Sequence, residues 1–449
     1  MTAFLRRLTP ILVTLGLLGC RLVAPSDATP TASPAVSLPS PAAGATALAE
    51  TPTARSTTLD PLPDMEAIQG QISTVRGLYP TAPLQRELLP PEELGRRIRD
   101  DFFGDYTVEE ADDDARLLAL LGLVEPGFDL RSLYIDFYQE QVAGYYDLET
   151  QTMLIVGSGW TGMERLTYAH EYVHALQDQT YGLEQGLGYT DEACEADSER
   201  CAAISALIEG DATLAEEQWW QAYATEQDVD DLMAALETLS FDVFERAPAY
   251  LQQDFSFPYE EGLEFVRYLF RRGGWSAVDK AYLDPPTTTE HILHPERYGK
   301  DDPIPVALPD LAAALGDGWR RIESGVLGEW FTRLVLDEEI PSWEAAEAAA
   351  GWGGDAYQAL VHDADERGAL VVLLRWDSAR DAFEFVEAFH DYAGWRFGER
   401  RVEQGDRRWS WDRGGVLLER IHDQTLWILA PDEAAAAVLR AAVEFPVSP

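Results

Sequence analysis

The sequence predicts an α+β protein with two folded units behind an N-terminal leader and tether. The chain has 449 residues, more than one ordinary domain holds, and 46% of them are hydrophobic, which is ample for real cores. Helical spacing and helix caps dominate residues 64–355, whereas alternation and short apolar runs dominate residues 356–449. We therefore expect a mainly helical first unit with a small N-terminal β-hairpin or sheet, followed by a small α+β unit.

The charge balance excludes one large class of partner. There are 34 basic and 79 acidic side chains, and the formal net charge is −45. Binding along a nucleic acid requires Lys and Arg on the phosphates, so we expect no nucleic-acid partner. The acidity predicts a solvated, self-repelling surface and says little about the substrate.

The first twenty residues have the form of an export leader. Arg6 and Arg7 precede the uncharged run Ile11–Leu18, which is too short to span a bilayer as a stable helix. The run ends in Leu-Leu-Gly-Cys20, which resembles the lipobox of bacterial lipoproteins. That resemblance implies that residues 1–20 are a signal peptide and that a lipidated Cys20 anchors the protein outside the cytoplasm on the bacterial cell membrane. The alternative is an ordinary cleaved signal peptide.

Residues 21–63 are rich in Pro, Ala, Ser and Thr, with few large apolar side chains, and predict a disordered spacer. Export also bears on the two remaining cysteines, Cys194 and Cys201. Outside the cytoplasm a disulfide between them is permitted, and we favour it over a metal site because no second pair or nearby His completes one.

Residues 64–140 predict short helices, over Met65–Leu78, from Pro90 onward and over Asp113–Leu123. They could form part of the first unit or cover it as a propeptide does. Next, Gln141–Tyr146 and Gln151–Val156 read as two strands joined by a turn.

The chain is organised around the stretch Tyr168–Gln179, which contains His170-Glu171-x-x-His174. On a helix this spacing puts both imidazoles on one face, where they can hold Zn²⁺, and Glu171 can reach a water on the metal. Thr161 and Glu164 form a predicted capping box, and Gly182 supplies a stop, so the motif falls in the middle of a helix.

Glu209 is the candidate third ligand. It lies in the predicted helix Ala202–Leu214, whose other side chains are small or apolar apart from Asp211. Small residues let two helices approach closely, and a buried acid is costly unless a cation or metal compensates it. The alternative is a Glu bonded to an Arg or to a helix end.

These residues together resemble the gluzincin branch of the zincin metallopeptidases. The sequence His-Ala-Leu-Gln-Asp-Gln that begins at His174 also resembles a set of predicted bacterial lipoprotein metallopeptidases. The similarity to that set is clearest over Gln141–Leu214. The resemblance implies a zincin-like fold, one Zn²⁺ held by His170, His174 and Glu209, and Glu171 as the general base acting on a peptide or protein. The His or Tyr that stabilises the transition state in that family is not placed by any motif here.

Three further features near the motif leave alternatives open. The strands at 141–156 are either an edge that pairs with an extended substrate or a plain structural hairpin. Asp178, one turn beyond His174, is either a hydrogen-bond partner of that imidazole or a solvent-facing acid. His291 and His294 are the next histidines, and for both we favour a structural role.

Downstream, Pro258 predicts the start of an amphipathic helix, and Gly273–Gly274 precede another. Residues 356–449 predict a mainly antiparallel sheet with two interspersed helices, for which a ferredoxin-like arrangement is one candidate. Its strands are predicted at Tyr357–Val361, Ala369–Trp376, Arg407–Trp411, Val416–Ile421 and Thr425–Leu429, and its helices at Asp377–Tyr392 and Asp432–Val443.

The sequence thus predicts a membrane-anchored, extracytoplasmic zinc metallopeptidase whose C-terminal unit packs on it or positions substrate. The rival from another class is a lipoprotein binding or scaffold module with a zincin-like fold and a structural or non-catalytic zinc. A zincin fold that keeps its metal and hydrolyses nothing is a third hypothesis.

Overall fold

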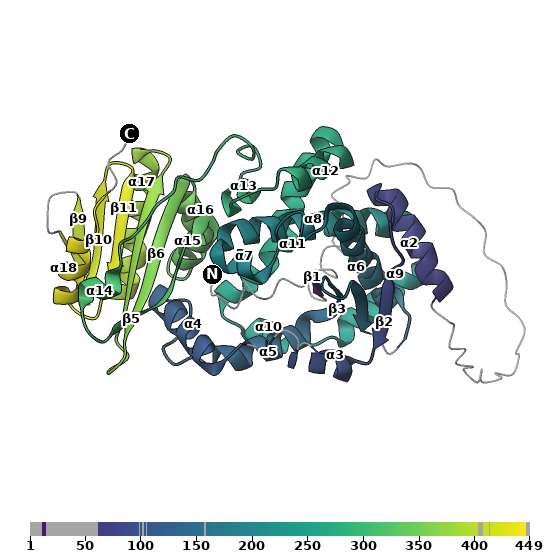
Figure 1. Ribbon diagram of the computed structural model, residues 1–449, viewed down its shortest axis with the longest axis horizontal. Coiled ribbons are helices and arrows are strands. Elements are labelled where there is room, and N and C mark those ends of the chain that lie inside the picture. Colours follow the sequence, from purple (N-terminus) through teal and green to yellow (C-terminus); the bar gives the residue numbers. More distant parts are fainter. Residues whose placement is uncertain are drawn as a thin grey trace, which may run out of the picture.

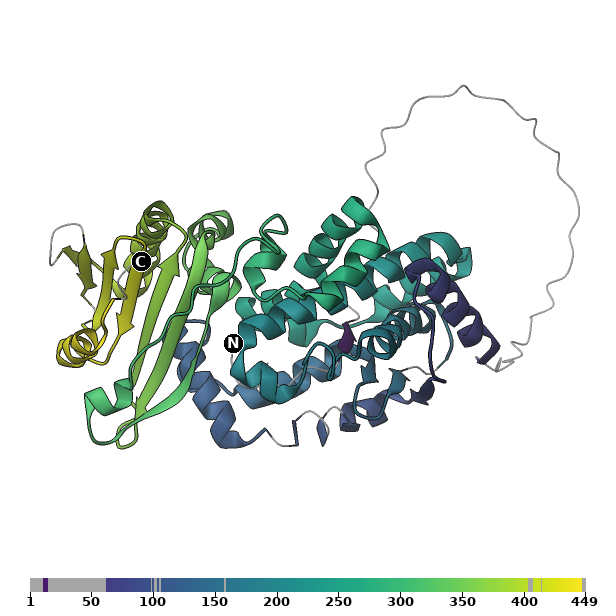
Figure 2. The same cartoon turned by 45° about the horizontal axis from the view of Figure 1, so that its top comes forward.

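The computed structural model describes residues 11–14, 62–97, 99–100, 103–104, 106–156, 159–402, 407–412 and 414–445. The fold is α+β, with a helical part at one end of an elongated molecule and a large antiparallel sheet at the other (Figures 1 and 2). Cys20 and most of the expected leader and tether lie outside the described residues. Among the described helices, none is long and apolar enough to cross a membrane.

The helical part contains a small mixed sheet of order β1-β3-β4-β2. Strands β3 (Val142–Asp147) and β4 (Thr152–Val156) pair antiparallel, β2 (Gln85–Leu89) runs parallel to β4, and β1 (Ile11–Thr14) pairs antiparallel with the other edge of β3. The helices are α2 (Leu62–Arg76), α3 (Pro91–Arg97), α4 (Val108–Leu121), α5 (Leu130–Gln141), α6 (Gly162–Tyr181), α7 (Asp191–Ala196), α8 (Ser198–Tyr223), α9 (Glu226–Thr238), α10 (Asp242–Arg246), α11 (Ala249–Gly273), α12 (Trp275–Leu283) and α13 (Thr289–Leu293).

Helix α6 begins and ends where its local chemistry predicts. The Thr161 hydroxyl accepts a backbone hydrogen bond from the first turn, and the Glu164 carboxylate accepts one from the Thr161 N–H, which completes the predicted capping box. At the other end Gly182 adopts φ 65°, a left-handed conformation that glycine reaches without strain. The helix is packed by α2, α8, α9 and the small sheet, so its middle turns are buried.

Helices α8 and α11 cross in backbone contact. A Cβ atom on Gly210 would lie 2.1 Å from the Gly262 carbonyl oxygen, and one on Gly262 would lie 2.2 Å from that of Ala206. The disulfide predicted between Cys194 and Cys201 is present, with a Cα–Cα distance of 5.2 Å, and it links α7 to the first turn of α8. The entry and the middle of α8 are therefore both fixed.

The predicted start of a helix at Pro258 is wrong, because α11 begins at Ala249 and carries Pro258 in its interior. Proline favours the first turn of a helix, where it lacks no required donor, and that preference suggested the shorter helix. Here the long amphipathic face that packs on α8 outweighs the missing backbone hydrogen bond.

The C-terminal part is a seven-stranded sheet of order β5-β6-β7-β11-β10-β9-β8, in which every neighbouring pair is antiparallel. Helices α15, α16 and α17 cover the face toward the helical part, and α14 and α18 cover the other (Figure 1). The elements are α14 (Leu311–Leu315), β5 (Trp319–Gly325), α15 (Gly328–Asp337), α16 (Ser342–Ala349), β6 (Trp352–His362), β7 (Gly368–Trp376), α17 (Ala379–Phe397), β8 (Arg400–Val402), β9 (Arg408–Trp411), β10 (Val416–Ile421), β11 (Gln424–Leu429) and α18 (Glu433–Ala442).

The ferredoxin-like arrangement considered from the sequence is wrong. In that fold a helix follows the first strand, whereas here β6–β7 and β10–β11 are hairpins that meet at the β7–β11 pair. The sheet also extends through β5 and the start of β6, on the N-terminal side of the expected boundary at 355/356. Alternate residues of β7 point to opposite faces of the sheet. Val372 packs in the core shared with α15 and α17, and Val371 packs in the core under α14 and α18, which explains why the strand is apolar throughout.

Two buried carboxylates lie where the two parts meet. Glu199 of α8 accepts hydrogen bonds of 2.6 Å from both the backbone N–H and the hydroxyl of Thr289. Asp355 of β6 accepts from the backbone N–H groups of Leu327 and Gly328, at the start of α15. A Cβ on Gly328 would lie 1.9 Å from a Glu199 carboxylate oxygen, so only glycine fits between these acids.

This junction predicts a pH dependence of stability. Burial raises the pKa of Glu199 to about 8, even though the hydrogen bonds from Thr289 oppose the shift. Because the folded-state pKa lies above that of the unfolded chain, about 4.3, the contribution of protonated Glu199 is complete at low pH and is lost as the pH rises toward 8. Between pH 5 and pH 8, the free energy of unfolding measured in urea should fall by at least about 1 kcal/mol more for the wild type than for Glu199→Gln.

The matched control is Glu192→Gln, which changes an exposed acid on α7. Its stability should follow pH as the wild type does. Parallel curves for Glu199→Gln and the wild type would contradict the assignment.

Candidate metal centre

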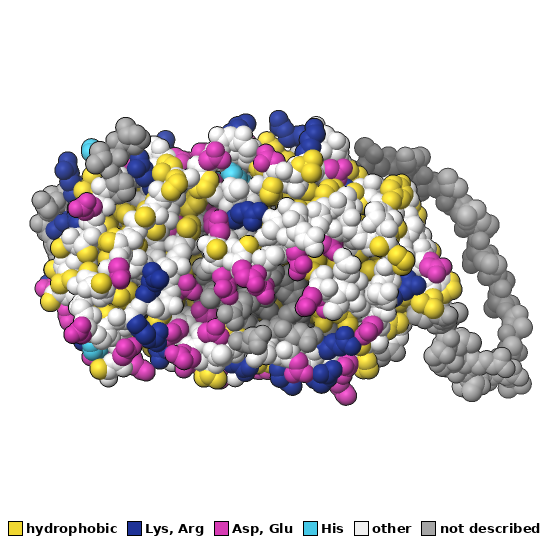
Figure 3. Space-filling view, viewed as in Figure 1, with side chains coloured by type: hydrophobic (Ala, Val, Ile, Leu, Met, Phe, Trp, Pro, Cys, Tyr) yellow, Lys and Arg dark blue, Asp and Glu magenta, His cyan; other side chains and the backbone are white. Residues whose placement is uncertain are grey.

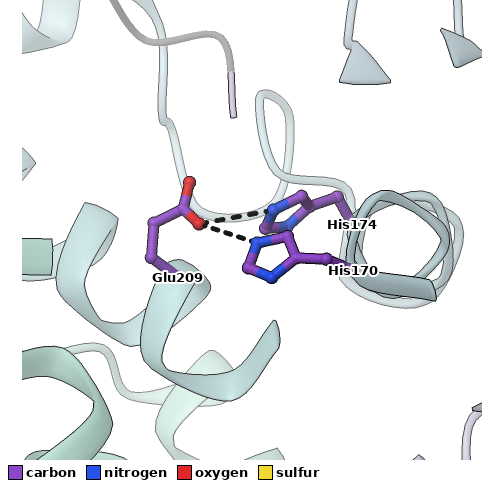
Figure 4. Close-up of side chains that lie close together, drawn as sticks. All are labelled: His170, His174 and Glu209. Carbon is purple, nitrogen blue, oxygen red and sulfur yellow. Dashed lines mark hydrogen bonds and ion pairs between the residues drawn. The ribbon is translucent and has the colours of Figure 1, made fainter. Parts of the chain in front are cut away.

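Three side chains predicted as metal ligands meet in the interior. Helix α6 presents His170 and His174 one turn apart, and α8 presents Glu209 opposite them (Figure 4). One carboxylate oxygen of Glu209 lies 3.2 Å from His170 Nε2 and 3.4 Å from His174 Nε2. The three ligand atoms lie within 4.8 Å of one another, and the side chains are 1%, 0% and 4% exposed, respectively.

The donor set fits a metal ion. Two imidazole nitrogens and one carboxylate oxygen are the ligand types of three-ligand zinc sites, and they fit other first-row metals as well. Among the described residues, the buried His174 Nε2 finds no hydrogen-bond partner, because its approach to Glu209 does not have hydrogen-bond geometry. A buried nitrogen of this kind is costly unless a ligand uses its lone pair. This group of residues could hold a metal ion.

The outer nitrogens of both imidazoles are held by protein acceptors. His170 Nδ1 lies 2.8 Å from a carboxylate oxygen of Glu216, and His174 Nδ1 lies 2.9 Å from the amide oxygen of Gln177. An acceptor at Nδ1 fixes the proton there and leaves the lone pair on Nε2, the nitrogen that points at Glu209. In its neutral form each histidine is therefore in the tautomer that can bind a metal through Nε2.

The charges in the metal-free site depend on one another. Burial would lower the pKa of His170, but hydrogen bonds to Glu209 and Glu216 and their negative charges raise it to about 10. Burial lowers the pKa of His174. Burial would raise the pKa of Glu209, but the two imidazoles bring it below its ordinary value. The carboxylates thus stabilise positive charge among them, which a proton supplies and a metal ion can replace.

Glu171 and Asp178, on the same helix, are placed differently. Glu171 follows His170 and is fully buried. Asp178 is neither the hydrogen-bond partner of His174 nor a purely solvent-facing acid. Its carboxylate accepts hydrogen bonds from the Tyr146 hydroxyl at 3.1 Å and from the Gln151 amide at 3.3 Å. The partner of His174 is its neighbour Gln177, which the sequence reasoning missed although it lies three residues on, where helical side chains meet.

Tyr259 is a second residue at the site that the sequence reasoning missed. It lies on α11, less than one turn before Gly262, so the close crossing of α8 and α11 brings its ring to 6.4 Å from the ring of His170. Burial raises the pKa of Tyr259 well above its ordinary value, and the charges of Glu209 and Glu171 raise it further. The phenol therefore keeps its proton at neutral pH and can donate a hydrogen bond.

His291 and His294 lie outside the site. The Nε2 atom of His291 is 2.6 Å from the carbonyl oxygen of Asp301, and that of His294 is 2.8 Å from Glu329. These contacts agree with the structural role favoured for both.

Comparison with known proteins finds a match in the C-terminal part alone. A family model described as a domain of unknown function (DUF8575) matches residues 317–440, which run from the start of β5 into α18. None of the curated proteins and none of the solved structures compared with the chain matches it. The matched segment excludes His170, His174 and Glu209, so the chemistry of the site must be argued from its geometry.

Metal binding should be visible as stabilisation. After treatment with a chelator, adding back a divalent cation is expected to raise the melting temperature, because a ligand specific for the folded state contributes about 4 kcal/mol at a thousand times its Kd. His174→Ala should lose this rise, since it removes one of three ligands.

His362→Ala is the matched control, because it removes an imidazole at the end of β6 that contacts Asp365 and not the site. It should respond to the cation as the wild type does. An equal rise in His174→Ala would place the binding elsewhere.

Proposed function

We propose that the protein is an extracytoplasmic, lipid-anchored zinc metallopeptidase in which His170, His174 and Glu209 hold the metal. The observation that carries the proposal is the buried group of two Nε2 atoms around one carboxylate oxygen, with Glu171 beside it on α6. A three-ligand set leaves a position for substrate, as catalytic zinc sites do and closed structural sites do not. The resemblance of His170-Glu171-x-x-His174 and Glu209 to gluzincins supports the same reading, including a zincin-like fold for the helical part.

When bound, zinc would polarise a peptide carbonyl and lower the pKa of an attacking water. Glu171 is the general base: it takes a proton from that water and returns it to the leaving amine. It follows a ligand on a helix capped at both ends, so the backbone that carries its carboxylate is fixed relative to that ligand. Hydrogen bonds that the Nδ1–H groups of both ligand imidazoles donate to Glu216 and Gln177 keep the rings oriented toward the centre.

Tyr259 is the proposed donor to the oxygen that becomes negative as the carbonyl is attacked. Its phenol is protonated, it approaches the site from α11, and the surrounding interior strengthens a hydrogen bond to a developing charge. This assigns the stabilising role that no motif in the sequence could assign.

The outer edge of β3 is the proposed track for an extended substrate. In the structure Ile11–Thr14 pairs antiparallel along this edge, with Leu12 opposite Tyr145. The same residues belong to the expected leader, whose removal would free the edge for another peptide. Gly144 of β3 packs against Thr167, one turn before Glu171, so β3 lies against the helix that carries the general base. Acidic side chains gather near the middle of the face seen in Figure 3.

A binding or scaffold function is the second candidate, and the C-terminal part favours it. A groove of about 1000 Å³ lies between this part and the helices α4 and α5. The matching family model covers the same part and leaves out the metal centre. On this alternative the metal would be structural or non-catalytic.

Replacing the general base tests the first candidate. Glu171→Gln should lower the rate of cleavage of casein or a peptide library by about 10² to 10⁴, because it removes proton transfer. Its zinc content should equal that of the wild type, since all three ligands remain. Glu217→Gln, an acid on α8 that pairs with Arg267, is the matched control and should cleave normally. Unchanged hydrolysis by the zinc-loaded Glu171→Gln protein would refute the mechanism.

Tyr259→Phe should lower kcat by about 10²-fold with little change in KM, because the phenol acts on the transition state. Zinc content should not change. Tyr250→Phe removes a buried hydroxyl from the same helix that lies near Tyr134, and it serves as the control for packing. Equal kcat values for the two variants would remove Tyr259 from the mechanism.

A further inference from the structure

The amide of Gln177 has one orientation that its surroundings accept. On one side it faces the carbonyl oxygen of Ile208 at 3.0 Å and a carboxylate oxygen of Asp211 at 3.0 Å, and both of these are acceptors. The NH₂ group must therefore point toward them, which leaves the amide oxygen facing His174 Nδ1. The tautomer of His174 thus depends on what holds Asp211 in place.

Asp211 is held by two more donors. Its other carboxylate oxygen accepts a 2.6 Å hydrogen bond from Arg76 Nε. The Tyr282 hydroxyl donates at 2.8 Å to the same oxygen that Gln177 contacts. Arg76, Asp211 and Gln177 are each 0% exposed. The pairs are therefore shielded from solvent, and in such surroundings hydrogen-bonded charges fix geometry strongly.

Arg76 is the last residue of α2, the first helix after the expected tether. Its guanidinium also contacts Asp279 at 2.8 Å and lies over the ring of Trp275 at 4.6 Å. If α2 were absent, the Asp211 carboxylate would remain buried without its cation, a costly state that the structure would relieve by rearrangement. The most direct rearrangement is to free the Gln177 amide to turn.

We propose that α2 is a working part of the metal centre, in which Arg76 acts through Asp211 and Gln177 to hold His174 in the tautomer and orientation that present Nε2 to the metal. This makes Arg76 a positioning residue 98 positions away in sequence from the ligand it serves. It also assigns α2 to the catalytic unit and excludes a removable propeptide ending beyond it. The proposal rests on the metal centre of the proposed function.

The test is the dissociation constant for zinc, measured by competition with a chromogenic chelator on the chain from Cys20 onward. Arg76→Gln and Gln177→Leu should each bind zinc about 10- to 100-fold more weakly than the wild type, the usual cost of losing the partner of a ligand histidine. Arg76→Lys restores a cation beside Asp211 and should bind zinc more tightly than Arg76→Gln.

The control is Arg165→Gln. Arg165 is a guanidinium on α6 that pairs with Asp64 of α2 and with Asp228, so its loss disturbs the same helices without touching Asp211 or Gln177. The melting temperatures of the metal-free proteins are measured alongside, and Arg165→Gln should keep the wild-type zinc affinity even where it melts earlier. If Arg165→Gln lost as much zinc affinity as Arg76→Gln, the loss would reflect disturbed packing of the helices, and the proposal would be overturned.

The outcomes separate the two levels of inference. If the wild type binds zinc tightly and Gln177→Leu binds it equally well, the positioning role is wrong and the metal centre stands. If the wild type binds no zinc, the proposed function itself is refuted. Should Arg76→Gln fail to fold, Gln177→Leu, which leaves the Arg76–Asp211 pair in place, decides the matter.

Discussion

The contact between the Nε2 atoms of His170 and His174 and one oxygen of Glu209 is the interaction on which the helical part depends. A carboxylate and two imidazoles are buried together there, and burial of such groups is stable only with a compensating charge and with hydrogen bonds on every side. The fold supplies both except at His174 Nε2, which has no hydrogen-bond partner among the described residues. Glu216 and Gln177 accept hydrogen bonds from the outer nitrogens of the imidazoles, and the crossing at Gly210 and Gly262 brings α11 close to α8 beside the site.

The parts of this centre that local chemistry determines could be predicted from the sequence. The spacing of His170 and His174 sets them on one face of a helix whatever surrounds it, and the capping box and Gly182 set the ends of that helix. Glu209 was recognisable because an acid flanked by small and apolar residues is costly to bury unless a cation or metal compensates it. The Cys194–Cys201 disulfide was predicted from the expected export and from the even number of cysteines left after Cys20, and the structure contains it.

The parts that distant segments build could not be predicted in this way. Arg76 meets Asp211 across 135 residues, and no local pattern records such a contact. Tyr259 was not recognised because Pro258 predicted that a helix begins there, whereas both residues lie in the interior of α11. In the C-terminal part β5 was missed because its residues Trp319–Gly325 lack the alternation of a buried strand: it is an edge strand, half-exposed along its length. The hairpins that meet at β7 and β11 likewise depend on long-range pairing.

The proposed centre is a metal ion held by three protein ligands, with a position left open toward Glu171. Anomalous diffraction at the zinc edge, from crystals of the metal-loaded protein, tests it most directly. We expect one peak per chain, about 2.0 to 2.2 Å from His170 Nε2, His174 Nε2 and a Glu209 carboxylate oxygen, with a non-protein ligand in the remaining position. A peak elsewhere, a fourth protein ligand closing the site, or the absence of any peak between these residues would contradict it.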